Sequence, residues 1–322
     1  MIGRRSLATL VAACMAAPAA AQPRATVWLV LGFPPGGLGD IVSRPLTERL
    51  RGRYGSAILM DHRVGAGGRL AAEHVRRAAP DGSVILQVPG SVMTVYPHIY
   101  RALRYDPLTD FTPAVALCSY TYSLTAGPGL PAAVRSVSDL LAWARAHPER
   151  ASYGVPSAGS PMHFAGMMLA RASGVSLAAV PYRGGAPLLQ DLLGGQVPFS
   201  FNVLTEVLPA VREGRLRSLA VLSAARSPHL PQVPTLVEQG FPAIALEDRL
   251  GWYLPAATPA PVVEALNSTV REALRQPDYR EVLARNGLTE LDLSAAEFAA
   301  IIRAEHARWG EIVRETGFTP DE

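Results

Sequence analysis

The chain has 322 residues, of which 49% are hydrophobic and 18% charged, as in folded proteins with one large or two average domains and unlike disordered or coiled-coil chains. All 30 basic residues are arginine, which excludes enzymes that need a Schiff-base, Walker A or kinase lysine. The formal net charge of +3 falls to +1 without the first 21 residues, which carry two arginines and no acid, so charge indicates no nucleic-acid partner.

The first 21 residues have the pattern of a secretory signal peptide. Arg4 and Arg5 precede an apolar run, and Ala19-Ala20-Ala21 supplies a cleavage site, so we expect cleavage near Ala21. The run is shorter than the ~20 residues that a membrane span needs. Lipidation at Cys14 and export by the twin-arginine route remain open alternatives.

Beyond this segment, apolar strand patterns alternate with helical patterns, which favours parallel sheets built from crossover units. We expect buried strands at residues 27–31, 57–60, 84–88, 178–180 and 219–222. We expect helices at residues 41–50, 70–78, 137–146, 162–172 and 188–193, and then a run of helices at 259–274, 279–285 and 295–315. The apolar spacing of the final helix predicts that it packs on the sheet.

Two long, apolar, extended stretches, residues 115–126 and 246–255, lie where the chain would leave and re-enter a first domain. We therefore expect a discontinuous domain 1 of residues 22–123 plus 247–322. Domain 2, residues 124–246, is then inserted into it, with the two crossing segments as a hinge. Cys118 in the first stretch is the only cysteine after the signal segment, and its apolar neighbours predict a buried, unreactive thiol.

Four glycine-rich turns lead from an expected strand into an expected helix, at residues 30–40, 65–68, 153–160 and 180–187. The start of a helix presents unpaired backbone N–H groups and partial positive charge, so it binds an anion without a basic side chain. Glycine lets the ligand approach the backbone closely. One turn from each domain could hold a small anion between them; the alternative is that these glycines are ordinary loop residues.

Other chemistry finds little support in the sequence. The dinucleotide-binding fingerprint fails because Val42 and Leu70 stand where its third glycine is needed. The hydrolase elbow fails because Val155 stands two residues before Ser157 in place of glycine. The histidines are scattered without a zinc-binding spacing. We therefore expect no catalytic residue, no metal site and no cofactor.

Seven motifs that follow one another along the chain carry a resemblance to a known family. They are Phe33-Pro34-Pro35-Gly36-Gly37 with Asp40, Gly65-Ala66-Gly67-Gly68, Pro80-Asp81-Gly82, Tyr105-Asp106-Pro107 with Asp110-Phe111-Thr112-Pro113, Val180-Pro181-Tyr182-Arg183-Gly184, Asp191-Leu192-Leu193-Gly194-Gly195, and residues 255–261. In this order they resemble the substrate-binding receptors of tripartite tricarboxylate transporters, the Bug-type extracytoplasmic solute receptors. The resemblance covers essentially the whole mature chain.

The resemblance implies an α/β, type II periplasmic binding protein, with two α/β domains, a cleft and a two-segment hinge. Such a receptor is expected to be periplasmic and monomeric, to capture a small carboxylate by domain closure and to deliver it to the membrane permease subunits of a tripartite tricarboxylate transporter. An orphan receptor that reports ligand occupancy to a signalling partner, or an enzyme on the same scaffold, remains an open alternative.

The resemblance also implies ligand-binding residues. The loop with Phe33, Pro35, Gly36 and Gly37 would grip one carboxylate through backbone amides and ordered water. Gly159 and Ser160 would face it from the other domain. Six further residues would line the same cleft: Ala66, Gly67, Ser91, Thr94, His163 and Asn202.

Three residues qualify this assignment. Arg183 could bond a distal carboxylate or lie solvated at the rim of the cleft. Asp40 would complement the helix dipole from the first turn, with ligand contact as the alternative. Asn202 stands where the family frequently has an acidic residue, which favours a plain carboxylate over an amino acid as ligand.

Overall fold

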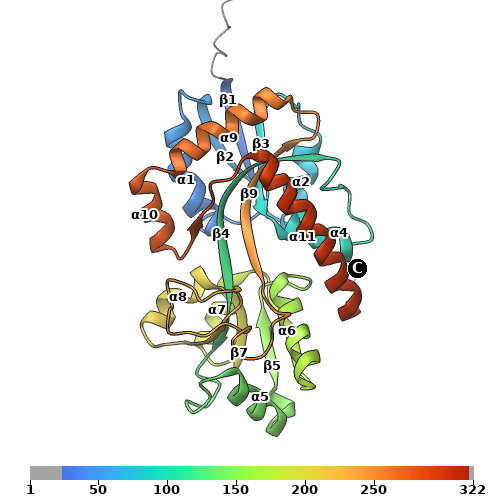
Figure 1. Ribbon diagram of the computed structural model, residues 1–322, viewed down its shortest axis with the longest axis vertical. Coiled ribbons are helices and arrows are strands. Elements are labelled where there is room, and N and C mark those ends of the chain that lie inside the picture. Colours follow the sequence, from blue (N-terminus) through green and yellow to red (C-terminus); the bar gives the residue numbers. More distant parts are fainter. Residues whose placement is uncertain (1–23, 319–322) are drawn as a thin grey trace, which may run out of the picture.

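The computed structural model describes residues 24–318, so the predicted signal segment, its cleavage site and Cys14 lie outside the described residues. Within that range two α/β lobes lie one above the other along the long axis (Figure 1). They share a continuous sheet with strand order β2-β1-β3-β9-β4-β7-β5-β6, in which β10 and β8 also pair with β4. The predicted two-lobed α/β architecture is therefore confirmed.

Lobe 1 contains the N-terminal strands and both ends of the described chain. Its strands are β1 (Arg24–Leu31), β2 (Gly55–His62), β3 (Val84–Pro89), β9 (Glu247–Pro255), β10 (Thr289–Glu290) and the first part of β4 (Phe111–Ala126). Its helices are α1 (Leu38–Leu50), the 3-10 turn η1 (Ala66–Gly68), α2 (Arg69–Arg76), α3 (Ser91–Thr94), α4 (Tyr96–Ile99), α9 (Ala260–Leu274), α10 (Pro277–Arg285) and α11 (Ala295–Thr316). Helix α1 packs with α9 and α10, and α11 packs with α3, α4 and β4, as predicted for the final helix.

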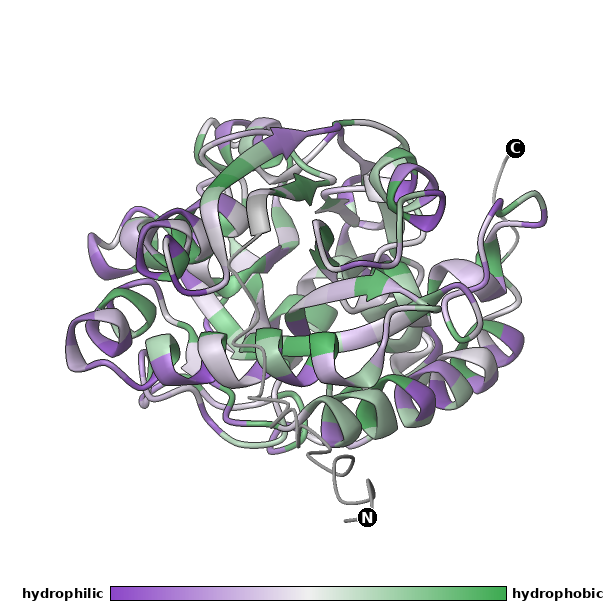
Figure 2. Ribbon diagram, turned by 90° about the horizontal axis from the view of Figure 1, so that it is seen from above, coloured by the Kyte–Doolittle hydropathy of each residue, from purple (hydrophilic) through white to green (hydrophobic). Residues whose placement is uncertain are grey.

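Lobe 2 is formed by the middle of the chain. Its strands are β5 (Ser152–Val155), β6 (Ala178–Pro181), β7 (Phe199–Val203), β8 (Arg217–Val221) and the end of β4. Its helices are α5 (Val137–Ala146), η2 (Pro148–Arg150), α6 (Pro161–Ser173), α7 (Gly185–Leu193) and α8 (Leu204–Arg212). Seen from above, hydrophobic residues lie at the centre of the molecule and hydrophilic residues lie mainly on the outer sides of the helices (Figure 2).

Two strands connect the lobes. The long strand β4 pairs with β9 between Phe111 and Thr121, and from Tyr122 onward it pairs with β7 and β8 of lobe 2. The return crossing follows Leu246, whose N–H donates to Leu222 O, and leads into β9. The apolar runs of both strands reflect burial on both faces of the sheet.

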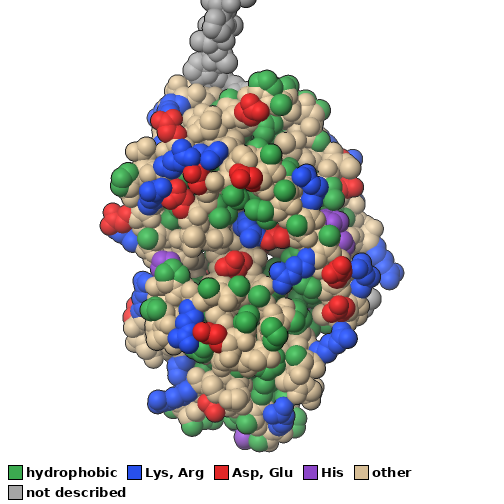
Figure 3. Space-filling view, viewed as in Figure 1, with side chains coloured by type: hydrophobic (Ala, Val, Ile, Leu, Met, Phe, Trp, Pro, Cys, Tyr) green, Lys and Arg blue, Asp and Glu red, His purple; other side chains and the backbone are tan. Residues whose placement is uncertain are grey.

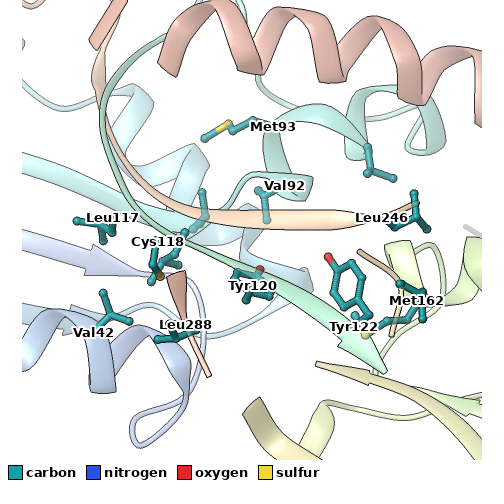
Figure 4. Close-up of a cluster of buried hydrophobic side chains, with 14 of the residues drawn as sticks. Val42, Val92, Met93, Leu117, Cys118, Tyr120, Tyr122, Met162, Leu246 and Leu288 are labelled. Carbon is teal, nitrogen blue, oxygen red and sulfur yellow. The ribbon is translucent and has the colours of Figure 1, made fainter. Parts of the chain in front are cut away.

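The hinge strands carry large buried side chains into both lobes. Tyr120 and Tyr122 project from β4 in a buried cluster that includes Val42 of α1 on the lobe 1 side and Met162 of α6 on the lobe 2 side (Figure 4). Cys118 in the same strand is fully buried, and burial raises the pKa of its thiol to about 12. The predicted unreactive thiol agrees with this environment.

The face shown in Figure 3 carries both basic and acidic side chains. On the face shown in Figure 3, arginine side chains are interspersed with acidic ones and form no basic stripe. Across residues 24–318, none of the helices combines the length and apolarity needed to cross a bilayer.

Candidate functional site

The direction of the strands places the helix-opening loops of the two lobes opposite each other. Strand β9 is antiparallel to both β3 and β4, so β3 runs the same way as β4, toward lobe 2, together with its parallel neighbours β1 and β2. Strand β7 is antiparallel to β4 and therefore runs toward lobe 1, together with its parallel neighbour β5 and with β6. The loops that follow these six strands meet between the lobes, where sheets of this kind bind ligands.

The β1–α1 loop, residues 32–37, is the most open of these segments. Phe33, Gly36 and Gly37 are exposed, and a β-carbon added to Gly36 would have no other atom within 4 Å. Gly36 has a φ of +83°, a conformation that favours glycine. Gly37 caps α1 and has no side chain, so no side-chain cap hydrogen-bonds to the first-turn amides of α1.

Asp40 in the first turn of α1 holds the β1–α1 loop in place through its side chain. It is buried, and its Oδ2 accepts hydrogen bonds from the Gly36 N–H at 2.9 Å and from Arg44 Nη2 at 2.8 Å. Its Oδ1 lies 2.7 Å from His62 Nε2. Burial opposes ionisation, but the bonds from Gly36, Arg44 and His62 outweigh it and hold the pKa of Asp40 below its usual value. Both oxygens are thus engaged by the protein, and the Gly36 amide is engaged as well.

The β2–α2 loop, residues 63–68, packs tightly against the β1–α1 loop. A β-carbon at Gly32 would lie 2.6 Å from the Gly68 Cα, and the Phe33 ring covers Gly68. The Tyr96 hydroxyl donates to Gly67 O at 3.1 Å. Ala66, with a φ of 47°, is the one non-glycine residue with positive φ in the described chain. These contacts hold the β2–α2 loop against Gly32 and Phe33 of the β1–α1 loop.

Ser91 and Thr94 are placed differently from each other. The Ser91 N–H donates to Asp248 Oδ1 at 3.2 Å, and Ser91 is half-buried at the start of α3. Thr94 is 1% exposed and its hydroxyl donates to Gly90 O at 3.1 Å. The Thr94 side chain therefore serves the local backbone and does not reach the open surface of lobe 1.

On lobe 2, Gly159 and Ser160 are buried at the start of α6. The Ser160 hydroxyl donates to Ser157 O at 2.8 Å and accepts from the His163 N–H at 3.3 Å, which makes it the helix cap. The Gly159 N–H donates to His163 Nδ1 at 3.1 Å. This bond leaves the imidazole proton on Nε2, and burial lowers the pKa of His163, so the ring is neutral at pH 7.

Side chains of lobe 1 cover Gly159 at the start of α6. A β-carbon at Gly159 would lie 2.5 Å from Ile99 Cδ1 and 3.5 Å from the Phe318 ring. The Phe318 ring also packs against His163 and Phe164, with ring centroids 5.2 and 5.1 Å apart. The end of α11 is therefore seated on α6, which ties the two lobes together beside the hinge.

Arg183 and Asn202 have contrasting environments. Arg183 lies exposed in the β6–α7 loop, and no ion pair joins it to another residue of the described range. Asn202 is fully buried on β7; its Oδ1 accepts from the Ser200 hydroxyl, whereas its Nδ2 has no partner among residues 24–318. Asn202 does not present its side chain to solvent in this conformation.

Two acidic residues that the sequence did not single out also belong to this region. Asp248 on β9 is buried and accepts from Ser91, from the Arg249 N–H at 2.7 Å and from the Tyr122 hydroxyl at 3.2 Å. Burial is the largest influence on its carboxyl group and raises its pKa. Asp248 thereby links both hinge strands to α3. The second, Glu206, lies in the first turn of α8.

The site between the lobes offers backbone amides and polar side chains. Within the part of the chain that the structure describes, no three His, Cys, Asp or Glu side chains are grouped to hold a metal ion. The Ser160 hydroxyl caps a helix and Cys118 is buried, so neither is placed as a nucleophile. On lobe 1 the site offers the backbone amides at the start of α1, which no side chain caps. The β5–α6 and β6–α7 loops of lobe 2 face them.

Comparisons with known proteins agree with this geometry. A sequence model described as "Tripartite tricarboxylate transporter family receptor" matches residues 42–318. The protein BugT from Bordetella pertussis is 30% identical over 306 residues, which cover 94% of this chain and 93% of BugT.

Solved structures are similar over nearly the whole chain. "R. palustris Rpa4515 with adipate" is 33% identical with a TM-score of 0.86, covering 93% of this chain and 99% of that one. The periplasmic binding protein BugD is 29% identical with a TM-score of 0.83, covering 93% and 100%. MatC from Rhodopseudomonas palustris with bound malate is 30% identical with a TM-score of 0.81, covering 90% and 99%. These likenesses confirm the predicted periplasmic-binding-protein fold.

Proposed function

Because the chain belongs to the tripartite tricarboxylate transporter receptor family, we propose that it is an extracytoplasmic receptor that closes its two lobes on a small carboxylate. It then delivers this ligand to the membrane permease subunits of a tripartite tricarboxylate transporter. The observation that carries the proposal is the likeness, over 93% of this chain, to a solved protein that holds adipate. We further propose that the chain is exported with cleavage near Ala21 and acts as a periplasmic monomer.

Lobe 1 supplies the carboxylate site in this proposal. The uncapped start of α1 offers the amides of Leu38 and Gly39 together with the positive end of the helix dipole. The Gly36 amide, which the sequence assigned to the ligand, instead bonds to Asp40 and shapes the loop. The ligand therefore meets a rigid, preorganised loop, and no lysine is needed to hold its charge.

Lobe 2 closes over the ligand in the proposed cycle. Its β5–α6 loop, residues 156–160, and its β6–α7 loop, residues 182–184, face the carboxylate site from the other side. The hinge strands β4 and β9 are the two connections through which closure can occur. The seat of Phe318 on α6 limits the direction of that movement, since it already joins the lobes at one side.

A thermal-shift screen followed by calorimetry tests the proposal. Mature protein is mixed with mono-, di- and tricarboxylates, amino acids and aromatic acids, including adipate and malate. A bound ligand at one hundred times its Kd adds about 2.7 kcal/mol of stability. If none of these acids shifts the melting temperature or gives a heat of binding, the proposed function is wrong.

The variant Gly37→Val tests whether the β1–α1 loop is the carboxylate-binding site. Gly37 has a φ of −83°, and a β-carbon there would approach only Pro34 O, at 3.7 Å, so the fold accommodates valine. The added side chain fills the space in front of the α1 amides. We expect the unliganded melting temperature to stay within a few degrees while carboxylate binding is lost. Undiminished affinity would contradict the assignment of the β1–α1 loop.

A further inference from the structure

Glu206 lies at the edge of lobe 2 that faces lobe 1, three residues after β7 ends at Val203. Its carboxylate packs against Gly185, the first residue of α7: a β-carbon built on Gly185 would lie only 2.1 Å from Glu206 Oε2. The positive end of the α7 dipole favours a carboxylate at this place. An acidic side chain of the chain itself therefore occupies the position where a ligand anion would meet α7.

This carboxylate has no partner. Glu206 is exposed, and no hydrogen bond or ion pair joins it to any residue between 24 and 318. Although the residue as a whole is exposed, protein surrounds its carboxyl group, and this burial raises the pKa of Glu206 to about 7. Asp40 on lobe 1 is the opposite case, since three protein donors hold its ionised form. The free energy needed to ionise Glu206 is therefore increased, and a nearby cation would lower it again.

Within residues 24–318, no cation on the elements around Glu206 is paired with it. Their charged and titratable groups are Tyr182, Arg183, Asp191, Arg212 and His229. The Tyr182 hydroxyl donates to Asp191 Oδ2 at 2.9 Å, so these two are engaged with each other. Burial lowers the pKa of His229, which keeps its ring neutral at pH 7. No salt bridge within the described range connects Arg183 or Arg212 to Glu206.

Asn202 adds a second unmet polar group on the same side of the lobe 2 sheet. A β-carbon at Gly154 would touch both Leu188 of α7 and Ser200, so the Ser200 side chain faces α7. Asn202 lies two residues further along β7 and faces the same way. Its fully buried Nδ2 has no acceptor within residues 24–318. An unpaired acceptor, Glu206, and an unpaired donor, Asn202, thus lie four residues apart in sequence, where β7 leads into α8.

We infer that Glu206 selects the ligand by charge, accepting an ammonium group from it, so that the preferred ligands are amino-substituted carboxylates; this inference rests on the proposed function. The ligand carboxylate goes to the α1 amides of lobe 1, and its ammonium group goes to Glu206 of lobe 2. A second carboxylate at the start of α7 would meet the like charge of Glu206. From Asn202 the sequence favoured a plain carboxylate over an amino acid as ligand. We infer the opposite, because Glu206, four residues after Asn202, supplies an acidic side chain.

Matched pairs of acids that differ only in an amino group test the inference. The pairs are succinate and L-aspartate, glutarate and L-glutamate, and adipate and L-2-aminoadipate, measured by calorimetry at pH 8. In at least one pair we expect the amino acid to bind about 10- to 100-fold more tightly, the value of one hydrogen bond to a charged group. Glu206→Gln should remove this preference, and Glu206→Asp should retain part of it.

A control and a pH series separate the role of Glu206 from a general loss of structure. Glu264→Gln changes an exposed glutamate on α9 of lobe 1 and should leave every affinity unchanged. Between pH 8 and pH 6 the wild-type preference for the amino acid should fall as Glu206 takes up a proton, and in Glu206→Gln it should stay flat. Circular dichroism and melting temperature verify that each variant is folded.

Each outcome has a definite meaning. Equal or tighter binding of the unsubstituted acid in every pair that binds, or a preference that survives in Glu206→Gln, overturns the inference and leaves the proposed function standing. Tighter binding at lower pH would show that Glu206 instead donates a proton to a second carboxylate, which also overturns it. If no member of any pair binds, the inference fails together with the proposed function.

Discussion

Asp40→Asn is the substitution whose consequences the structure defines most fully. The change keeps the size of the side chain but removes its charge and one of its two acceptor oxygens. Asp40 Oδ2 holds the Gly36 N–H and Arg44, and Oδ1 faces His62. We therefore expect Asp40→Asn to lower the free energy of unfolding and to loosen the β1–α1 loop.

The expected loss can be worked out from these contacts. The Arg44 side chain is 63% exposed, so its pair with Asp40 contributes only about 0.3–0.5 kcal/mol. The bonds from Gly36 and His62 are shielded by burial of Asp40, and hydrogen bonds to a charged group contribute about 1.5–3 kcal/mol each. Asparagine can still accept the bond from Gly36, in a weaker neutral form. The free energy of unfolding should fall by about 2 kcal/mol.

Urea unfolding and hydrogen exchange check this prediction without any ligand. Because the pKa of Asp40 is lowered in the folded state, its contribution is present above the unfolded pKa near ~4 and is lost as the pH falls through the folded value. The difference between wild type and variant should therefore be full at pH 7 and shrink in acid. Amides of residues 33–40 should also exchange faster in the variant.

Asp139→Asn provides the matched control. Asp139 is an exposed first-turn carboxylate in the capping box of α5 on lobe 2. Its loss should affect stability less and should leave exchange at residues 33–40 unchanged. Equal unfolding free energies for wild type and Asp40→Asn, together with unchanged exchange in the loop, would refute the role assigned to Asp40.

Three further predictions concern the hinge and the loop. Burial raises the pKa of Glu305 to about 7, above its unfolded value, so stability should fall by about 2–3 kcal/mol as the pH rises from about 4.5 to 7; Glu305→Gln should flatten this decline in urea titrations. Phe318→Ala should lower the unfolding free energy by about 1–2 kcal/mol because α11 loses its seat on α6, and an unchanged urea midpoint would argue against that contact. Gly36→Ala and Gly214→Ala both place a methyl group at positive φ with no neighbour within 4 Å, so both should cost about 1–2 kcal/mol, but only Gly36→Ala should weaken carboxylate binding in calorimetry.

Much of the fold could be predicted from local patterns. Helix α5 occupies the predicted residues 137–146 because Ser136 and Asp139 form a capping box at its start. The hinge strands were visible because both of their faces are buried, so their sequences are almost continuously apolar. Helices α1 and α7 begin three residues earlier than predicted, since their first turns contain glycine and lack the apolar spacing that marks the helix interior.

Strand β7 and helix α8 were missed for a physical reason. Ser200 and Asn202 interrupt the apolar pattern of β7, and their burial depends on long-range contacts that no local pattern shows. Pro209 lies inside α8 and argues against a helix when only the sequence is read. Glu206 was overlooked as a consequence, because its place at the edge of lobe 2 follows from these two elements.

The sequence predicts the loops of the candidate site but does not determine the hydrogen bonds within them. The sequence places Gly36 in an anion-binding turn, yet its amide is engaged because Asp40 turns back to it, a choice of side-chain direction that spacing does not determine. Gly159 is likewise covered by Ile99 and Phe318, which lie far from it along the chain. The sequence therefore identifies which loops meet, and the structure decides which of their polar groups remain open.

A crystal structure of the mature protein with the carboxylate that stabilises it most would show directly how the receptor holds its ligand. We expect the ligand between the lobes, with its carboxylate on the first-turn amides of α1 and with lobe 2 closed over it through β4 and β9. A ligand bound outside these facing loops, or lobes that keep their unliganded arrangement around it, would show that the proposed binding mode is wrong.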